Sequence, residues 1–357
     1  MSDWGLAKSA CVNPEIRNYH QSFIGMLHTN HQEIPVDKLS VIRNLVPLLS
    51  GCRMHDVNSE ILLPPAMQWS SPEEGGDNSF LFSEKKRVPW EKKSDTVFWR
   101  GSASGGTNSE SDWTRSHRHR LLSMTNGTLA AQQQSRANEP VPKHVPGGSP
   151  RLPYNFPLPD LAVYPLAVLT GPDGANLGKY AAWINGLTDT AFVHLRCWPP
   201  VSWFVGNGAN CPYNGAFYEV KAPVSSTEQF AYKYHPDLDG ASYSGRYRAI
   251  LQSNSLPLKA TIYDEWHDSR LIPWAHFVPM DVSNIDWWGI FEYFFGFEDQ
   301  RPGHDEVARS IAADGSAWSG TVLRDEDMLA YTYRLILELA RLNDERRENM
   351  GWTDDLV

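Results

Sequence analysis

The residues with the clearest chemical potential lie in the stretch "DLDGASYSGRYR", which runs from Asp237 to Arg248. Its first half contains an Asp-x-Asp pair, Asp237 and Asp239, and carboxylates in this arrangement can hold a divalent metal against a diphosphate. Its second half is a turn of small residues that leads into Arg246 and Arg248, and arginines can hold a diphosphate without metal. The sequence therefore offers two different ways of binding one kind of anion.

The turn in the second half suits an anion because its residues are small: Gly240, Ser242, Ser244 and Gly245. Such residues let backbone N–H groups approach an anion closely, and a helix that begins here would direct its positive end at it. Arg246 can bind two phosphate oxygens at once through its guanidinium fork. Two structural alternatives stay open. The arginines could be solvated beside an ordinary turn, and the aspartates could cap the turn or pair with the arginines.

Two further segments carry candidate residues. "FWRGSASGG" places Arg100, Gly101 and Ser102 at the end of an expected strand, where Arg100 could bind phosphate and Ser102 could hydrogen-bond phosphate or sugar. An ion pair beneath a tight turn is the alternative for Arg100. "YDEWHDSRLIPWAHF" holds Glu265, which could accept hydrogen bonds from ribose or sugar hydroxyls, and His276, which we interpret as a core histidine.

The basic run "RSHRHR" at residues 115–120 suggests nucleic-acid binding at first sight. The whole chain has a net charge of −10, however, whereas a general nucleic-acid binder is expected to be basic. We therefore interpret this run as a solvated helix face near the phosphate end of the molecule, and we expect no nucleic-acid partner.

The elements around these residues alternate between strand and helix. Strands are expected at 94–101, 190–198, 228–240, 256–264 and 274–281, and helices at 35–51, 112–124, 242–255, 284–297, 304–318 and 325–347. This alternation predicts an α/β sheet of Rossmann type over about 94–340. Ligands bind such sheets at the carboxyl ends of the strands, where both "FWRGSASGG" and "DLDGASYSGRYR" fall. The dense prolines of 137–160 predict a loop or insertion.

The cysteines and the hydropathy limit the class of protein further. Cys11, Cys52, Cys197 and Cys211 show no CxxC spacing, which argues against a thiolate metal site and leaves open two disulfides or four buried thiols. No apolar run approaches the ~20 residues that span a bilayer, and the N-terminus lacks the pattern of a signal peptide. We expect no membrane segment in this chain.

Three segments of the sequence resemble glycosyltransferase family 90. They are "FWRGSASGG", "FAYKYHPDLDGASYSGRYRAILQSNSLPLKATIYDEWHDSRLIPWAHFVPMDVS" and "LRDEDMLAYTYRLILELARL", which occur in the family's order and approximate spacing. The resemblance is closest to the fungal capsule-associated branch, which includes capsular xylosyltransferases and is related to the protein O-glucosyltransferases. It extends over 94–345, and weakly over about 38–93.

The resemblance implies a GT-B-like fold in which a Rossmann-type donor domain, 94–345, holds a nucleotide sugar opposite a shortened acceptor-side region, 1–93. The implied reaction is an inverting transfer of xylose or glucose from a UDP-sugar to a hydroxyl of a glycan or glycoprotein, in the Golgi or secretory lumen. By the same resemblance, Arg100–Ser102 and Gly240–Arg246 bind the pyrophosphate, and neither a metal nor another cofactor is required.

A carboxylate base would take the proton of the acceptor hydroxyl in such a reaction. The family places this base upstream of the Arg-Gly-Ser strand, and the matching stretch here, "HDVNSEILLPPAMQW", offers Glu60 and, as a second choice, Asp56. Glu60 departs from the family's aspartate by one methylene. Two other functions stay open. The chain could be a non-catalytic or truncated relative that binds UDP-sugar or glycan, or an enzyme that uses Asp237 and Asp239 with a metal.

Overall fold

The computed structural model describes residues 48–54, 60–69, 80–105, 108, 113, 116–129, 177–197, 211, 218, 220–282, 284, 286–298 and 301–346. The second base candidate Asp56, the insertion expected at 137–160 and Cys11 lie outside these residues.

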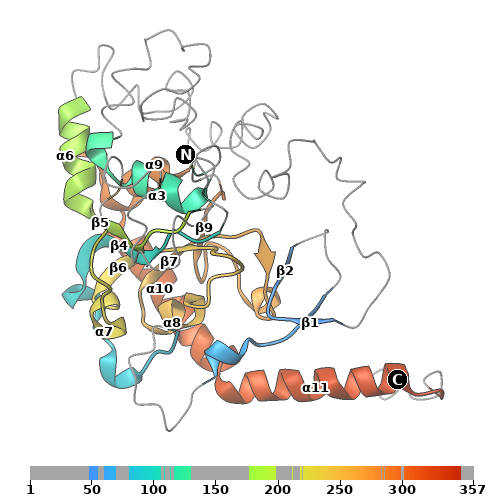
Figure 1. The fold of residues 1–357 in the computed structure, drawn as a ribbon. Helices are drawn as coiled ribbons and strands as arrows, with labels where there is room; N and C mark the ends of the chain where they lie inside the picture. The colour runs from blue at the N-terminus through green and yellow to red at the C-terminus, as the bar shows by residue number, and fades with distance from the viewer. Residues whose placement is uncertain are drawn as a thin grey trace.

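A five-stranded parallel sheet forms the centre of the fold, in the order β5-β4-β6-β7-β9 (Figure 1). Its strands are β4 (Ser94–Ser102), β5 (Thr188–His194), β6 (Tyr232–Leu238), β7 (Leu256–Ala260) and β9 (Val278–Pro279). Each neighbouring pair is parallel, so the chain must cross over from the end of one strand to the start of the next. The predicted α/β class is confirmed, and the sheet is compatible with a Rossmann-type arrangement.

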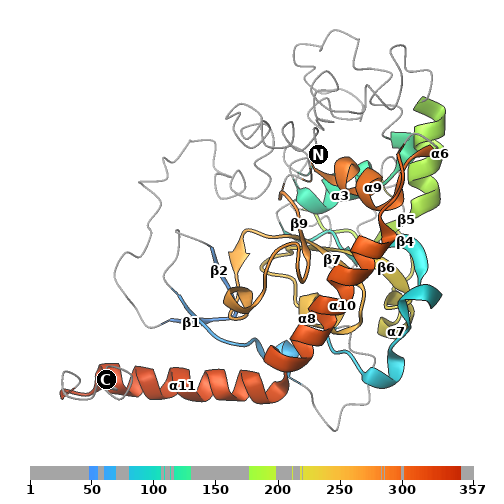
Figure 2. The same ribbon diagram turned by 180° about the vertical axis from the view of Figure 1, so that it is seen from behind.

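Helices supply these crossovers and cover the sheet. They are α3 (His117–Met124), α6 (Leu177–Leu187), α7 (Ser226–Gln229), α8 (Tyr247–Gln252), α9 (Trp287–Phe295), α10 (Asp305–Val322) and α11 (Asp325–Asn343). Short 3-10 helices are η3 (Ala66–Gln68), η4 (Glu84–Lys86), η5 (Trp90–Lys92) and η8 (Asp268–Arg270). α10 packs against α8 and β7, whereas α11 extends away from the sheet (Figure 1 and Figure 2).

Two small sheets contain the strands of the N-terminal segment, and the second of them joins this segment to the rest of the molecule. β1 (Leu49–Ser50) pairs in parallel with β3 (Ile61–Leu62), and β2 (Arg53–Met54) pairs antiparallel with β8 (Tyr263–Asp264). The Tyr331 hydroxyl of α11 donates a hydrogen bond to the Leu62 carbonyl at 2.9 Å. These contacts fix the strand that follows Glu60.

The helix expected at 35–51 is wrong at its C-terminal end, because Leu49 and Ser50 form β1. Pairing with β3 decides the conformation there, and tertiary pairing of this kind overrides a local apolar period. The helix expected at 242–255 is also shorter than predicted, since α8 begins only at Tyr247. The remaining predicted strands and helices from β6 onward are confirmed in type, although β9 is short.

Aromatic side chains fill much of the core. In α9 the residues Trp287, Ile290, Phe291 and Phe294 recur at helical spacing, and all of them are buried. Trp288 is buried as well, and its indole N–H donates to the Met124 carbonyl at 3.0 Å. Burial of one such side chain contributes about 1.5–3 kcal/mol. This packing holds α3 in place beside α9.

Residues 116–120, the described part of the basic run at 115–120, do not form a solvated helix face, so that interpretation is wrong. His117, Arg118, His119 and Arg120 belong to α3, and none of them exposes more than 8% of its surface. The His119 ring packs 4.8 Å from the Phe192 ring, while the Arg118 guanidinium bonds backbone carbonyls. Charge density in the sequence predicts exposure, but here aromatic and carbonyl partners compensate for burial.

Candidate functional site

The candidate site lies where β4 and β6 end side by side in the sheet. The turn from Gly240 to Arg246 follows β6, and the residues Arg100–Ser102 form the end of β4. The Arg246 Nη1 donates a hydrogen bond to the Arg100 carbonyl at 2.6 Å. The structure therefore brings together the two segments that the sequence placed at the carboxyl ends of separate strands.

Arg246 is half-buried at this edge. Its guanidinium lies 5.7 Å from the centroid of the Trp99 ring, which provides a flat apolar surface beneath it. Burial lowers the pKa of Arg246, and the negative charge of nearby Asp237 opposes this change. Arg246 therefore stays next to the backbone of both turns, in a position from which an anion can be bound.

The Arg100 side chain points elsewhere. Its Nη2 forms an ion pair with the Asp189 Oδ1 of β5 at 2.7 Å, and its Nη1 donates to the Asp189 carbonyl at 2.8 Å. The structure thus shows the ion pair that was the alternative for this residue. Gly101 is small for a packing reason, because a Cβ there would lie 2.6 Å from the Trp99 ring. At this turn the backbone, rather than Arg100, faces the candidate site.

The Asp-x-Asp pair is fully engaged by the protein. Asp237 accepts a hydrogen bond from the Ser244 hydroxyl and lies 3.9 Å from the Lys259 Nζ. Asp239 accepts bonds from the Thr261 hydroxyl at 2.7 Å and from the Ile262 N–H at 2.8 Å. Both carboxylates are buried. They hold the turn and its junction with β7 together. This agrees with the alternative that the aspartates cap the turn instead of binding a metal.

The small residues of the turn also have packing partners. A Cβ on Gly240 would lie 3.0 Å from both the Arg118 Nη2 and the Ser104 hydroxyl. A Cβ on Gly245 would lie 2.4 Å from the Met67 sulfur of the N-terminal segment. The packing of the protein therefore requires glycine at both positions, whatever ligand binds. Ser242, in the same turn, is half-exposed.

Glu265 lies just after β8 in a buried polar cluster. Its Oε2 accepts a bond from the Lys259 Nζ at 2.9 Å, and its Oε1 has no partner within the described residues. Burial raises the pKa of Glu265 to about 8, and the Lys259 charge opposes this. With His267 and Asp268 it forms a group of potential metal ligands, into which Lys259 already brings a positive charge.

Glu60 directly precedes β3 and is half-buried. Burial raises the pKa of the Cys52 thiol, and the charges of Glu265, Asp239 and Glu60 raise it further. Glu60 itself leads into β3, which pairs with β1, and β2 of the same segment pairs with β8, just before Glu265.

Arg118 is a residue of this edge that the sequence interpretation missed. Its guanidinium hydrogen-bonds the ends of both β4 and β6, through the carbonyls of Ser102, Leu238 and Asp239. The apolar "LLSM" that follows the basic run was the one signal in the sequence that α3 is a core helix.

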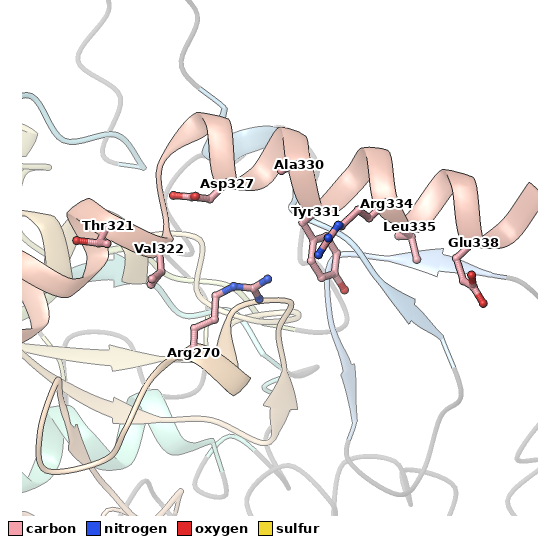
Figure 3. Close-up of a pocket in the computed structure, with 9 residues that line it drawn as sticks. All are labelled: Arg270, Thr321, Val322, Asp327, Ala330, Tyr331, Arg334, Leu335 and Glu338. Carbon is pink, nitrogen blue, oxygen red and sulfur yellow. The ribbon is translucent and has the colours of Figure 1, made fainter. Parts of the chain in front are cut away.

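A cavity of about 550 Å³ lies between η8 and the α10–α11 junction, away from these residues (Figure 3). Arg270 extends from η8 toward α11, and its guanidinium lies 5.0 Å from the Trp266 ring and 5.3 Å from the Tyr331 ring. None of the residues that the sequence singled out for nucleotide-sugar binding or catalysis lines this cavity.

Two buried groups near the edge respond to pH with opposite sign. Burial raises the pKa of Asp239 to about 7, so its contribution to stability is complete below about pH 4 and is lost as the pH rises through 7. Burial lowers the pKa of His119 to about 3. Its contribution is present above about pH 6.5 and is lost as the pH falls toward 3.

We expect Asp239→Asn and His119→Phe to tilt the pH dependence of the free energy of unfolding in opposite directions. Each group changes the slope by about 1.4 kcal/mol per pH unit between roughly pH 5 and 6.5. Asp239→Asn should make the slope with rising pH more positive, and His119→Phe should make it less positive. Urea unfolding at a series of pH values measures both slopes, and changes of the same sign would contradict the assignment.

Comparison with known proteins gives a family match for the part of this edge that follows β6. Residues 216–350 match the family model described as Glycosyl transferase family 90. The match includes β6, the 240–246 turn, Glu265 and α11, whereas Arg100, Arg118 and Glu60 lie before it. The resemblance to glycosyltransferase family 90 is therefore confirmed for this part of the chain.

Curated relatives agree with this family. The chain is 30% identical over 122 residues to protein O-glucosyltransferase 2 of Danio rerio, which is 33% of this chain and 23% of that protein. It is 28% identical over 120 residues to protein O-glucosyltransferase 3 of Homo sapiens, which is 33% of this chain and 22% of that protein. The chain thus spans about a quarter of the length of the curated relatives it matches.

Proposed function

We propose that this chain is a glycosyltransferase whose residues 94–345 bind the donor, and that it transfers glucose or xylose from a UDP-sugar to a hydroxyl of a glycan or glycoprotein, with inversion. The turn from Gly240 to Arg246 carries the proposal, because it lies at the carboxyl end of β6 within the family match and contacts the end of β4. The names of the relatives, protein O-glucosyltransferases, make glucose the first donor sugar to test.

A GT-B arrangement, with residues 1–93 on the acceptor side, is part of this proposal. The pairing of β2 with β8 supports it, because this pairing brings the N-terminal segment to the donor edge. The bond from Tyr331 to Leu62 adds a second connection between the same two parts.

Arg246 is the proposed ligand of the diphosphate. Within the described residues, one hydrogen bond to the Arg100 carbonyl engages its guanidinium, and the other N–H groups remain for phosphate oxygens. Arg118 lies nearby, and burial together with repulsion from Arg246 lowers its pKa. A diphosphate bound at this edge would offset the repulsion between the two guanidinium groups.

Metal is not required in the proposed reaction. The Asp237 and Asp239 carboxylates are engaged by Ser244, Thr261 and the Ile262 N–H, so a cation would have to compete with these bonds. Activity that persists in EDTA supports this assignment, and activity that needs added Mg²⁺ or Mn²⁺ would overturn it.

Glu60 is the proposed base. Its carboxylate takes the proton of the acceptor hydroxyl while the hydroxyl oxygen bonds the anomeric carbon and the bond from that carbon to UDP breaks. Attack from the face opposite UDP inverts the anomeric configuration. Glu265, buried beside Lys259, is the proposed acceptor of hydrogen bonds from the ribose hydroxyls.

A UDP-release assay tests the proposal directly. Release is measured from UDP-glucose and UDP-xylose, with and without acceptor glycans. Acceptor-dependent release supports the transferase. If UDP binds but is released from neither donor with any acceptor, the chain is a non-catalytic UDP-sugar-binding protein. If UDP does not bind at all, both functions are excluded.

We expect Arg246→Ala to weaken UDP binding by about 1.5–3 kcal/mol, the usual contribution of hydrogen bonds to a charged group. Calorimetry with UDP measures the change. Arg341→Ala is the matched control, because Arg341 pairs with Glu338 on the exposed part of α11. Unchanged UDP affinity in Arg246→Ala would rule out this diphosphate site.

A secretory location is the last part of the proposal. Cys197 and Cys211 form a disulfide, and disulfides persist in oxidising compartments. Neither α10 nor α11, nor any other helix in the described part of the chain, combines the length and apolarity needed to cross a bilayer.

A further inference from the structure

We infer that Arg118 is a positioning residue that sets the separation of the two turns between which the UDP-sugar binds. This inference rests on the proposed function for its consequence, but its geometry stands on contacts of the described residues alone. Arg118 lies in α3, outside the segment that matches the family model.

The guanidinium of Arg118 joins the ends of two neighbouring strands. Toward β6, its Nε donates to the Asp239 carbonyl at 2.7 Å and its Nη2 to the Leu238 carbonyl at 2.9 Å. Toward β4, its Nη1 donates to the Ser102 carbonyl at 2.9 Å and to the Ser104 hydroxyl at 2.8 Å. One planar group therefore fixes both turns at once.

Arginine is required for this role because its donors form a rigid fork. A lysine at the same place carries a single nitrogen, which reaches one turn and leaves carbonyls of the other unpaired. Space is also closed around the group. Gly240 lies so close that a Cβ would sit 3.0 Å from the Arg118 Nη2, and the guanidinium lies 5.5 Å from the Trp99 ring centroid.

Arg118 acts on the ligand through Arg246. Its Nε and both of its terminal nitrogens already donate to protein acceptors, so its role is distinct from that of a diphosphate ligand. Arg246 instead reaches from the second turn to the Arg100 carbonyl of the first. A change in the separation of the turns therefore moves the guanidinium of Arg246 relative to the site of the diphosphate.

Arg118→Lys tests this role, with Arg120→Lys as the matched control. Arg120 is a buried arginine of the same helix, and the charges of Asp281 and Tyr218 act on it. We expect Arg118→Lys to weaken UDP binding roughly 10- to 100-fold, the scale for a misplaced binding group. We expect Arg120→Lys, which keeps the positive charge, to leave UDP affinity within about twofold of the wild type.

Hydrogen exchange supplies a readout that does not depend on UDP. Exchange at residues 102–104 and 238–246 should rise in Arg118→Lys, while exchange in β7 and α10 should stay at the wild-type level. Ser104→Ala removes one acceptor of Arg118 and leaves the arginine, so we expect the same change in smaller degree. This variant keeps the test valid if Arg118→Lys fails to fold.

Two results would overturn the inference. The first is an equal loss of UDP affinity in Arg118→Lys and Arg120→Lys, because it would show a general disturbance of α3. The second is unchanged exchange at both turns in Arg118→Lys, or in Ser104→Ala if Arg118→Lys does not fold. If the wild-type protein itself fails to bind UDP, the proposed function is lost, while the exchange experiment still decides whether Arg118 positions the turns.

Discussion

Glu60→Gln is expected to lower the rate of sugar transfer by about 10²- to 10⁴-fold, the usual contribution of a general base. The amide cannot accept the proton of the acceptor hydroxyl, although it has nearly the size of the carboxylate. UDP affinity should change little, since the proposed diphosphate ligand Arg246 belongs to a different element. The change is measured by acceptor-dependent UDP release at saturating UDP-glucose, together with calorimetry for UDP.

The position of Glu60 in the fold supports this expectation. Glu60 directly precedes β3, which pairs with β1, and β2 of the same segment pairs with β8 beside Glu265. Glu84→Gln is a matched control, because Glu84 is an exposed glutamate of η4 that pairs with Arg87. Transfer that survives in Glu60→Gln and is lost in Asp56→Asn would move the role of base to Asp56.

The sequence predicts the order of elements well where an apolar period is long. α9, α10 and α11 follow such periods, and β6 ends at a turn of small residues. Prediction fails where partners distant in the sequence decide the structure. Leu49 and Ser50 continue an apparent helical period, yet they form β1 because β3 offers them a pairing edge.

The candidate site likewise has a part that the sequence predicts and a part that it does not. The 240–246 turn could be predicted because small residues and an arginine follow a strand. The direction of a side chain could not, since it depends on its spatial neighbours. Arg100 faces Asp189 of β5, and Arg118 reaches two strand ends from a helix, and neither partner is close in sequence. Residue type and local spacing therefore predict which backbone forms the site, but leave open which side chain serves it.

Arg246 and Arg248 show how far two neighbouring arginines can differ. Arg246 reaches the end of β4 at the candidate site. Arg248 is buried, and it donates to the Leu323 carbonyl at 2.7 Å, to the Gln68 carbonyl at 2.5 Å and to the Asp325 carboxylate at 2.7 Å. It therefore joins α8 to the N-terminal segment and to the α10–α11 junction.

Arg248→Ala is accordingly expected to lower the free energy of unfolding by about 2–6 kcal/mol, because it leaves the buried carbonyls of Gln68 and Leu323 without their donor, and each such loss costs about 1–3 kcal/mol. Arg324→Ala is the control. Arg324 pairs with Asp327 at 2.9 Å on the surface, where solvent screening leaves such a pair with little effect on stability. Urea unfolding measures both variants. A loss in Arg248→Ala no larger than that in Arg324→Ala would show that the three contacts do not stabilise the fold.

The same pair of arginines separates stability from binding. Arg246→Ala should lose UDP affinity with a smaller loss of stability, since its one backbone bond lies at a half-buried edge. Arg248→Ala should lose stability while its folded fraction keeps UDP affinity, because none of its three partners belongs to the 240–246 turn. If the two variants instead lose affinity and stability in equal proportion, the 240–246 turn and the contacts of Arg248 are not independent of each other. The site would then depend on the packing of α8 as a whole.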